Sequence, residues 1–170
     1  MVVGDPFRFA VIYETVECWN YDETFHNWLL FFSINSKLYP YSVDDFSSTL
    51  ASEIPILADS LKNIVVDKEI YSLKTVDAYT KLYNMALPDD YDIPNDYRYV
   101  ISPPTIAHFD YYIFAVSNGK KVRVLASKLK YDIINSIYKL NNIKIREVYV
   151  PCTDMYMIIY GLDDWIQNLR

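Results

Sequence analysis

The chain has 170 residues, of which 52% are hydrophobic and 22% are charged, and its formal net charge is −6. A chain of this size buries roughly 70% of its unfolded surface, so we expect one globular domain over residues 1–170 and exclude a disordered tail protein. Only three residues are glycine. Dinucleotide fingerprints and phosphate-binding loops need clustered glycines, and both are therefore excluded.

The first predicted elements form an antiparallel hairpin. Residues 7–19 alternate in polarity and are rich in aromatic and β-branched side chains, which is typical of a strand. The polar residues 20–24 turn the chain, and the apolar residues 28–34 are a second, more deeply buried strand. Asn35 and Ser36 then form a tight turn before residues 37–40.

Two helices are predicted next. Ser42 followed by Asp45 approximates a capping box, so a helix is expected from about residue 43, bent or interrupted at Pro55. Thr75 can cap a second helix that ends at Pro88. The apolar face of that helix consists of Val76, Tyr79, Leu82, Tyr83 and Ala86.

A long surface excursion and a hairpin follow. Residues 88–104 hold four of the eight prolines, around a short strand expected at residues 97–101. Residues 111–116 and 122–126 flank Asn118-Gly119, which is the strongest short-range hairpin signal.

The remaining elements complete the fold class. A third helix is expected near residues 129–140, a second late hairpin from residues 144–150 and 155–160, and a short helix near 162–169. The predicted class is α+β, a single domain with a mainly antiparallel sheet of hairpins and about three to four helices.

The residues that usually carry chemistry are scarce. His26 and His108 have no metal-like spacing with another ligand, and Cys18 and His26 are eight residues apart, which fits a structural thiol and a loop histidine better than a nucleophilic pair. We expect no metal, no cofactor and no catalytic residues. Cys18 and Cys152 are interpreted as buried thiols of a cytoplasmic protein, because no secretory signal or membrane-length apolar run is visible.

Positive charge is concentrated in residues 119–146, which contain eight basic residues against one acidic residue. Such a segment could follow phosphates, and a nucleic-acid-binding or phosphate-binding accessory protein is therefore an alternative function. On an acidic protein, however, a solvated hairpin and helix face is the favoured interpretation.

Negative charge and tyrosine occur together in the excursion after the second helix. The run lacks the glycine and the late glutamate of a calcium-binding loop. Tyrosine is favoured in interfaces, and aspartate steers a basic partner, so the pattern indicates a docking surface, although a merely solvated loop is the competing interpretation. The candidate contacts are Asp89, Asp90, Tyr91, Asp92, Asp96 and Tyr97.

The N-terminal quarter resembles a known family. Residues 1–11, with the sequence Gly4-Asp5-Pro6-Phe7 at their centre, together with Glu17-Cys18-Trp19, residues 30–35 and Leu38-Tyr39-Pro40, are similar to the immunity protein 42 family of bacterial polymorphic-toxin loci. The similarity covers about the first 40 residues, and Asn35-Ser36 replaces the family's glycine-containing turn. Gly4-Asp5-Pro6 is expected to have a structural role, since Asp5 can cap local backbone groups.

The resemblance implies a cytoplasmic antidote, encoded beside a toxin, that binds and blocks the toxin domain without performing chemistry. An acidic inhibitor suits a basic toxin, because opposite charges accelerate their association. A nucleic-acid-binding protein using residues 119–146 is the alternative, and an unrecognised hydrolase comes third.

Overall fold

The computed structural model describes residues 1–16, 27–41, 48–90, 92–132, 137–140 and 143–168. All paired strands are antiparallel, and the fold is α+β, as the sequence predicts. The strands are β1 (Val2–Asp5), β2 (Phe9–Thr15), β3 (Asn27–Ile34), β4 (Lys37–Tyr39), β5 (Ser48–Thr49), β6 (Tyr111–Ser117), β7 (Lys121–Lys128), β8 (Lys130–Asp132), β9 (Ile137–Lys139) and β10 (Arg146–Pro151). The helices are α1 (Leu50–Lys62), α2 (Lys68–Ser72), α3 (Thr75–Ala86), α4 (Pro104–His108) and α5 (Cys152–Asn168).

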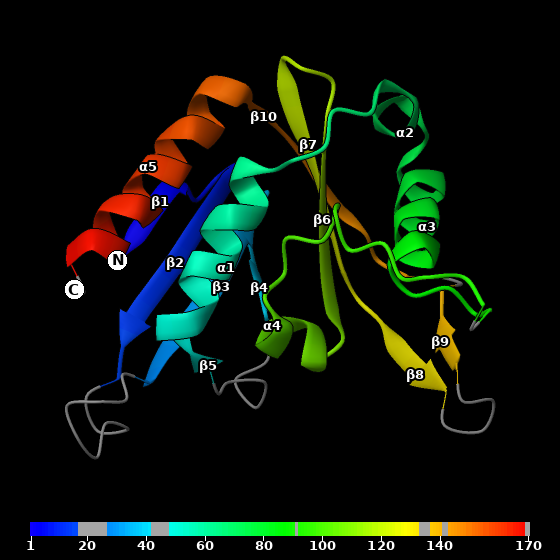
Figure 1. The fold of residues 1–170 in the computed structure, drawn as a ribbon, viewed down its shortest axis with the longest axis horizontal. Coiled ribbons are helices and arrows are strands. Elements are labelled where there is room, and N and C mark those ends of the chain that lie inside the picture. Colours follow the sequence, from blue (N-terminus) through cyan, green and yellow to red (C-terminus); the bar gives the residue numbers. More distant parts are fainter. Residues whose placement is uncertain (17–26, 42–47, 91, 133–136, 141–142, 169–170) are drawn as a thin grey trace.

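The first sheet has the order β1-β2-β3-β4, with β5 also pairing with β3. It contains the predicted opening hairpin, in which Val11 of β2 lies opposite Phe32 of β3. Asn35 and Ser36 have φ angles of 49° and 61°, which are the left-handed values of the expected tight turn. This sheet lies on the left of Figure 1 with α1 and α5 packed against it.

The Gly4-Asp5-Pro6 motif has a structural role, as expected. The Phe7 N–H donates to Asp5 Oδ1 at 2.9 Å, which closes the turn between β1 and β2. Gly4 has a φ of +107°, and a Cβ there would lie 2.5 Å from the Phe9 carbonyl oxygen. Only glycine fits this position without strain.

The second sheet has the order β10-β7-β6. The hairpin of β6 and β7 is confirmed around Gly119, whose φ is +90°. The expected late hairpin is wrong, because β10 pairs with β7 and residues 155–160 belong to α5. Alternating aromatic and apolar residues suggested a strand there, but the buried residues recur at helical spacing: Met155, Ile158, Ile159, Leu162 and Trp165.

The predicted helices are partly confirmed. α3 spans Thr75–Ala86, as expected, and α1 begins at Leu50, while residues 42–47 lie outside the described part of the chain. The helix expected near residues 129–140 is wrong, because β8 and β9 pair there, with Lys130 opposite Lys139. The strand expected at residues 97–101 is reduced to one bridge from Val100 to Phe114.

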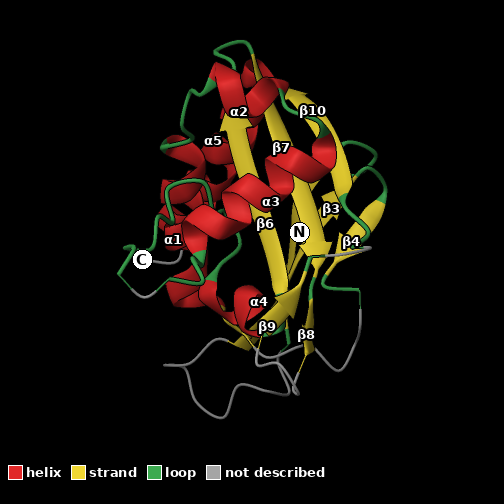
Figure 2. Ribbon diagram, turned by 90° about the vertical axis from the view of Figure 1, so that its right-hand side faces the viewer, coloured by secondary structure: helices red, strands yellow, loops and turns green. Residues whose placement is uncertain are grey.

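Two groups of buried side chains form the core. The larger lies between the first sheet, α1, α5 and the β6–β7 hairpin, and the smaller lies between α3 and the other face of that hairpin. Alternate residues of β6 enter the two groups, for example Ile113 the first and Phe114 the second. Figure 2 shows α1, α4 and α5 on one side of the molecule and β3, β4 and β10 on the other.

Candidate functional site

The predicted docking residues lie in the segment between α3 and α4. Asp89, Asp90 and Asp92 are exposed, and Tyr91 lies outside the described residues. No ion pair to these three aspartates is found within the described part of the chain. We call residues 89–97 the acidic loop; among the described residues, no cation pairs with Asp89, Asp90 or Asp92.

The acidic loop is held against the end of α3 by two hydrogen bonds. Asn95 Nδ2 donates to the Ala86 carbonyl at 2.7 Å, and the Asp96 N–H donates to the Met85 carbonyl at 2.8 Å. These bonds satisfy carbonyls at the helix end that have no partner within the helix. The loop therefore returns along α3 instead of extending away from the molecule.

Asp96 differs from the other aspartates of the loop. Its carboxylate accepts two hydrogen bonds from the Arg98 guanidinium, at 2.9 and 2.7 Å. These bonds from Arg98 lower the pKa of Asp96. Asp96 is thus already paired, and its geometry suits a residue that orients the loop better than one that contacts a partner.

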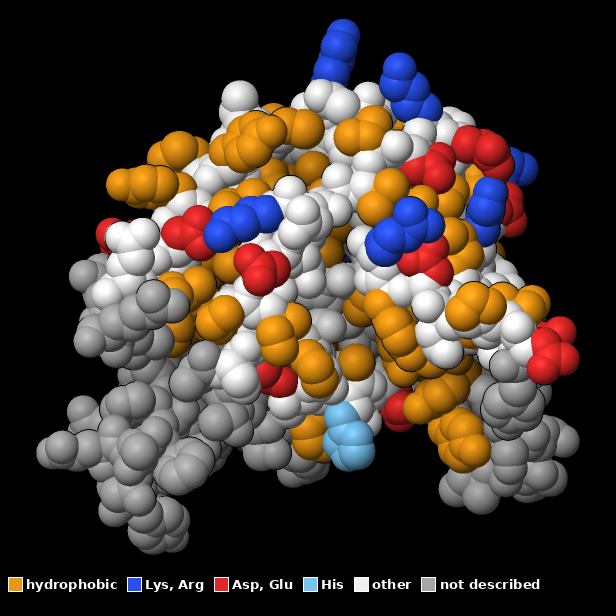
Figure 3. Space-filling model, viewed as in Figure 1, with side chains coloured by type: hydrophobic (Ala, Val, Ile, Leu, Met, Phe, Trp, Pro, Cys, Tyr) orange, Lys and Arg blue, Asp and Glu red, His pale blue; other side chains and the backbone are white. Residues whose placement is uncertain are grey.

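Tyr97 lies at the edge of an apolar cavity of about 600 Å³. Its side chain is 55% exposed, and the cavity extends from α1 across α4 to β6 and β9. Other lining residues are Ile56, Leu87, Val100, His108, Tyr112 and Tyr138. Figure 3 shows apolar side chains gathered on this face between α4 and the β8–β9 hairpin.

The cavity wall is fixed by tyrosines that pack edge to face. Tyr83 lies 5.6 Å from Tyr112 and 6.3 Å from Tyr138, measured between ring centroids. The Tyr138 hydroxyl donates to Asp110 Oδ1 at 2.6 Å. Burial raises the pKa of both Tyr83 and Tyr138.

The structure thus brings one predicted docking residue, Tyr97, together with cavity residues that the sequence did not single out. Leu87 and Tyr97 line the cavity, Asp89, Asp90 and Asp92 are exposed in the segment between those two residues, and Asp96 is occupied by Arg98. Tyr112 and Tyr138 were missed because they come from β6 and β9, far away in sequence. Alternation in β6 was the available signal for Tyr112, but no local pattern places Tyr138 beside it.

Comparisons with known proteins identify the family. The sequence model described as "Immunity protein 42" matches residues 1–165. The chain belongs to this family. Among solved structures, CdiI from Burkholderia dolosa AUO158 aligns with a TM-score of 0.76 at 24% identity, over 95% of this chain and 97% of that chain. At that identity the likeness shows a shared fold, and no curated protein sequence matches.

The chain is therefore an immunity protein, an antitoxin-like protein whose partner is a toxin protein.

None of the helices in the described part of the chain is long and apolar enough to cross a membrane. The described residues contain no group of histidine, cysteine and carboxylate side chains that could hold a metal ion. Cys152 is half-buried at the first residue of α5, which corrects the expectation of full burial, and Cys18 and His26 lie outside the described residues.

The basic segment of this immunity protein does not form one continuous surface. Arg123 is 1% exposed and pairs with Glu147, and Lys139 pairs with Asp132. Lys120 and Lys121 are exposed at the tip of the β6–β7 hairpin. A nucleic-acid track along residues 119–146 is therefore not supported.

Proposed function

We propose that this immunity protein protects cells by binding a basic toxin domain through the acidic loop and the apolar cavity beside Tyr97. The proposal treats the whole chain as one binding domain that acts in the cytoplasm and performs no chemistry of its own. The observation that carries it is that Asp89, Asp90 and Asp92, which form no ion pair within the described residues, belong to a segment bounded by Leu87 and Tyr97, and both of these residues line the apolar hollow. An apolar centre with a charged rim is the usual anatomy of a protein interface.

Charge compensation distinguishes the acidic loop from two carboxylates near α5. Asp154 pairs with Arg8 at 2.8 Å, and Asp163 pairs with Lys62 at 2.7 Å, both near α5. Paired carboxylates project little field, whereas unpaired ones attract a cationic partner over about a Debye length. The acidic loop is thus the better surface for guiding a basic toxin.

The cavity supplies a buried apolar contact for the toxin, which charge alone does not provide. Binding energy in interfaces is concentrated in a few large side chains that enter well-packed pockets. The cavity of about 600 Å³ could accept one such side chain of the toxin, and Tyr97 would cover it from the edge. Tyrosine offers large contact area at low cost in side-chain entropy.

The first experiment tests protection. The toxin domain encoded beside this gene is expressed with and without the immunity protein, and growth and complex formation by pull-down are measured. We expect survival and a stable complex. Cells that die equally in both cases would refute the function itself.

The second experiment tests the surface. In the triple variant Asp89→Asn, Asp90→Asn and Asp92→Asn the net charge changes by three, and the side chain at residue 90 keeps an oxygen for the Asp92 N–H. We expect association to slow about tenfold at low salt, within the range known for electrostatic steering. The difference should vanish near 0.5 M salt, where the Debye length is only about 4 Å.

The matched control is Glu14→Gln, Asp154→Asn and Asp164→Asn, which changes the net charge equally on the half of the molecule that contains α5. We expect its association rate to stay within about twofold of the parent. Tyr97→Ala should mainly speed dissociation, because interface truncations act on the off-rate. If the two triple variants slow association equally, the acidic loop is not the docking surface, although protection would still hold.

A further inference from the structure

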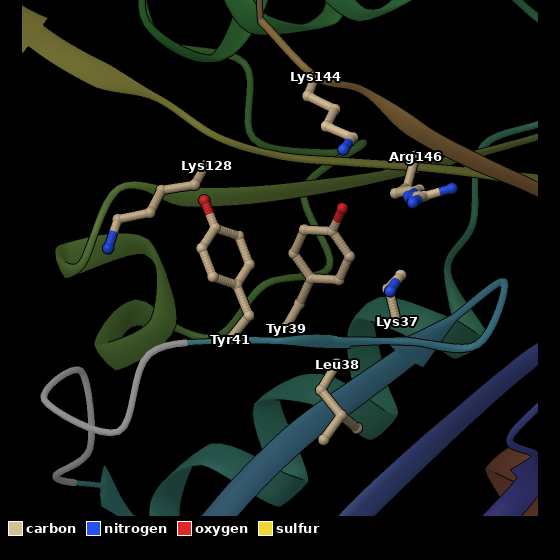
Figure 4. Close-up of a pocket in the computed structure, with 7 residues that line it drawn as sticks. All are labelled: Lys37, Leu38, Tyr39, Tyr41, Lys128, Lys144 and Arg146. Atoms are coloured by element: carbon tan, nitrogen blue, oxygen red, sulfur yellow. The ribbon is translucent and has the colours of Figure 1, made fainter.

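A second cavity, of about 440 Å³, lies on the side of the molecule opposite to α1 and α4, where β4 meets the end of β7 and the start of β10. Four cationic side chains line it, namely Lys37, Lys128, Lys144 and Arg146. Figure 4 shows the Tyr39 ring directed toward Lys144 and Arg146, the Tyr41 ring directed toward Lys128, and Lys37 near Arg146. Among the described residues that line this cavity, none is acidic.

The charge of this basic cavity is largely unpaired. Within the described residues, Lys37, Lys144 and Arg146 form no ion pair with a carboxylate. Lys128 Nζ lies 4.6 Å from the centroid of the Tyr111 ring. Several like charges that converge on one hollow repel each other, and an anion placed among them relieves that repulsion.

The basic cavity is also held rigidly. Lys37, Lys128 and Arg146 each lie on a strand, and Arg146 of β10 is opposite Ala126 of β7. Tyr39 is 4% exposed, and its ring packs edge to face on Tyr111 at 6.2 Å. Binding groups on strands lose little entropy when a ligand arrives, so the site is organised before binding.

We propose that the basic cavity binds a small phosphate-bearing ligand that carries at least three negative charges, such as a triphosphate group. A single carboxylate would neutralise only one of the three cations Lys37, Lys144 and Arg146, whereas a triphosphate can contact all three together. Arginine and lysine are the usual partners of phosphate oxygens. The volume of about 440 Å³ exceeds the need of one phosphate and falls in the range of small-molecule sites.

The aromatic side chains favour a ligand with a planar group attached to the phosphates. Tyr41 is 64% exposed at the mouth, and its ring packs against Tyr39 and Tyr111. A ring held in this way offers a stacking surface for a base, as tyrosines do in nucleic-acid sites. A nucleotide would use both the cations and the ring, and this inference does not depend on where the toxin binds.

The test is calorimetric titration of the full chain with inorganic triphosphate, adenosine triphosphate, citrate and a 12-nucleotide single-stranded DNA. We expect saturable binding of both triphosphates, with one ligand per chain and the nucleotide tighter. Lys37→Ala with Lys144→Ala should weaken binding at least tenfold. The control Lys120→Ala with Lys121→Ala, an equal charge change at the far end of β7, should alter it less than twofold.

The variant Lys37→Arg with Lys144→Arg keeps the charge and should retain binding, which separates loss of the site from loss of the fold. No binding at 1 mM triphosphate, or equal weakening in the two alanine variants, would overturn the proposal. Citrate that binds as tightly as triphosphate would exclude phosphate selectivity. DNA that binds more tightly than both triphosphates would assign the cavity to nucleic acid instead of a small ligand.

Discussion

Replacing Arg123 with methionine should strongly destabilise the fold, because this side chain connects three elements. Arg123 lies on β7 and is 1% exposed. Its Nη1 donates to the carbonyls of Tyr71 at 2.8 Å and Leu73 at 2.7 Å, at the end of α2, and its Nε donates to Glu147 of β10. Methionine fills similar space but leaves these acceptors without their donor.

The loss of unfolding free energy in Arg123→Met depends on the hydrogen bonds that Glu147 keeps. Removing one member of a buried ion pair costs about 3–5 kcal/mol. Glu147 would keep its hydrogen bonds from Thr75 at 2.7 Å and Tyr149 at 2.6 Å, which favours the lower end, about 3–4 kcal/mol. At about 2–4 °C per kcal/mol for a chain of this length, the melting temperature should fall by about 6–16 °C.

Urea unfolding followed by circular dichroism measures this change. Lys121→Met is the control, because Lys121 is exposed on the same strand, and it should cost less than about 0.5 kcal/mol. Adding Glu147→Leu to Arg123→Met should recover part of the loss, since the uncompensated carboxylate is removed as well. A loss below about 1 kcal/mol for Arg123→Met would refute the argument that this ion pair holds α2 to the sheet.

Three further predictions concern the protein alone. Burial opposes a low pKa at Glu147, but hydrogen bonds from Tyr149 and Thr75 and the charge of Arg123 lower the pKa of this carboxyl below 4.5. The ionised carboxylate therefore contributes its full stability above pH 4.5, and this contribution is lost as the pH falls through the pKa of the folded state. We expect Glu147→Gln to flatten the fall of the urea midpoint between about pH 5 and 3. Burial raises the pKa of Tyr39 and Tyr149 to about 12, so stability should decrease from pH 10 toward 12 as unfolded tyrosines ionise, and equal midpoints at pH 9 and 11 would contradict this. Gly4→Ala should cost about 2–3 kcal/mol in urea unfolding because its Cβ would meet the Phe9 carbonyl, whereas Gly119→Ala, with nothing within 4 Å, should cost only about 1 kcal/mol for its positive φ.

Local patterns predicted the elements whose neighbours in sequence are also neighbours in space. The β2–β3 and β6–β7 hairpins follow from alternation and turn residues, and α3 follows from helical spacing. β1 was missed because neither the polarity nor the burial of its residues alternates along the strand. Its pairing with β2 also depends on the positive φ of Gly4.

The errors in secondary structure arise where apolar residues are so frequent that they match both the strand period and the helical period. Residues 155–160 are aromatic and branched, so they suit a strand locally, and burial against α1 and β1 makes them a helix instead. Residues 129–140 show the reverse error, because β8 and β9 pair there, with Lys130 opposite Lys139. Tertiary packing overrides local propensity in both segments.

The candidate site was predictable only in its charged half. Clustered aspartates and prolines mark an exposed loop in any fold, so the position of Asp89, Asp90 and Asp92 needed no tertiary information. The apolar half depends on Tyr112 of β6 and Tyr138 of β9, whose ring centroids lie 6.4 Å apart and which both pack on Tyr83 of α3. The basic cavity is equally non-local, since Lys37 joins residues about 90 to 110 positions later in the chain.

The separation of the two charged sites bears on how a basic partner would approach. Within the described residues, Asp89, Asp90 and Asp92 of the acidic loop form no ion pair, and neither do Lys37, Lys144 and Arg146 of the cavity between β4 and β10 on the other side. A basic toxin is attracted to the first surface and repelled by the second, so the field of the molecule orients an encounter as well as accelerating it. Because the net charge is −6, the attraction prevails at distance, and the repulsion acts only when the wrong face is presented. A ligand bound in the basic cavity would weaken that repulsion and leave the acidic loop unchanged, which makes the two sites electrostatically coupled but separable by mutation.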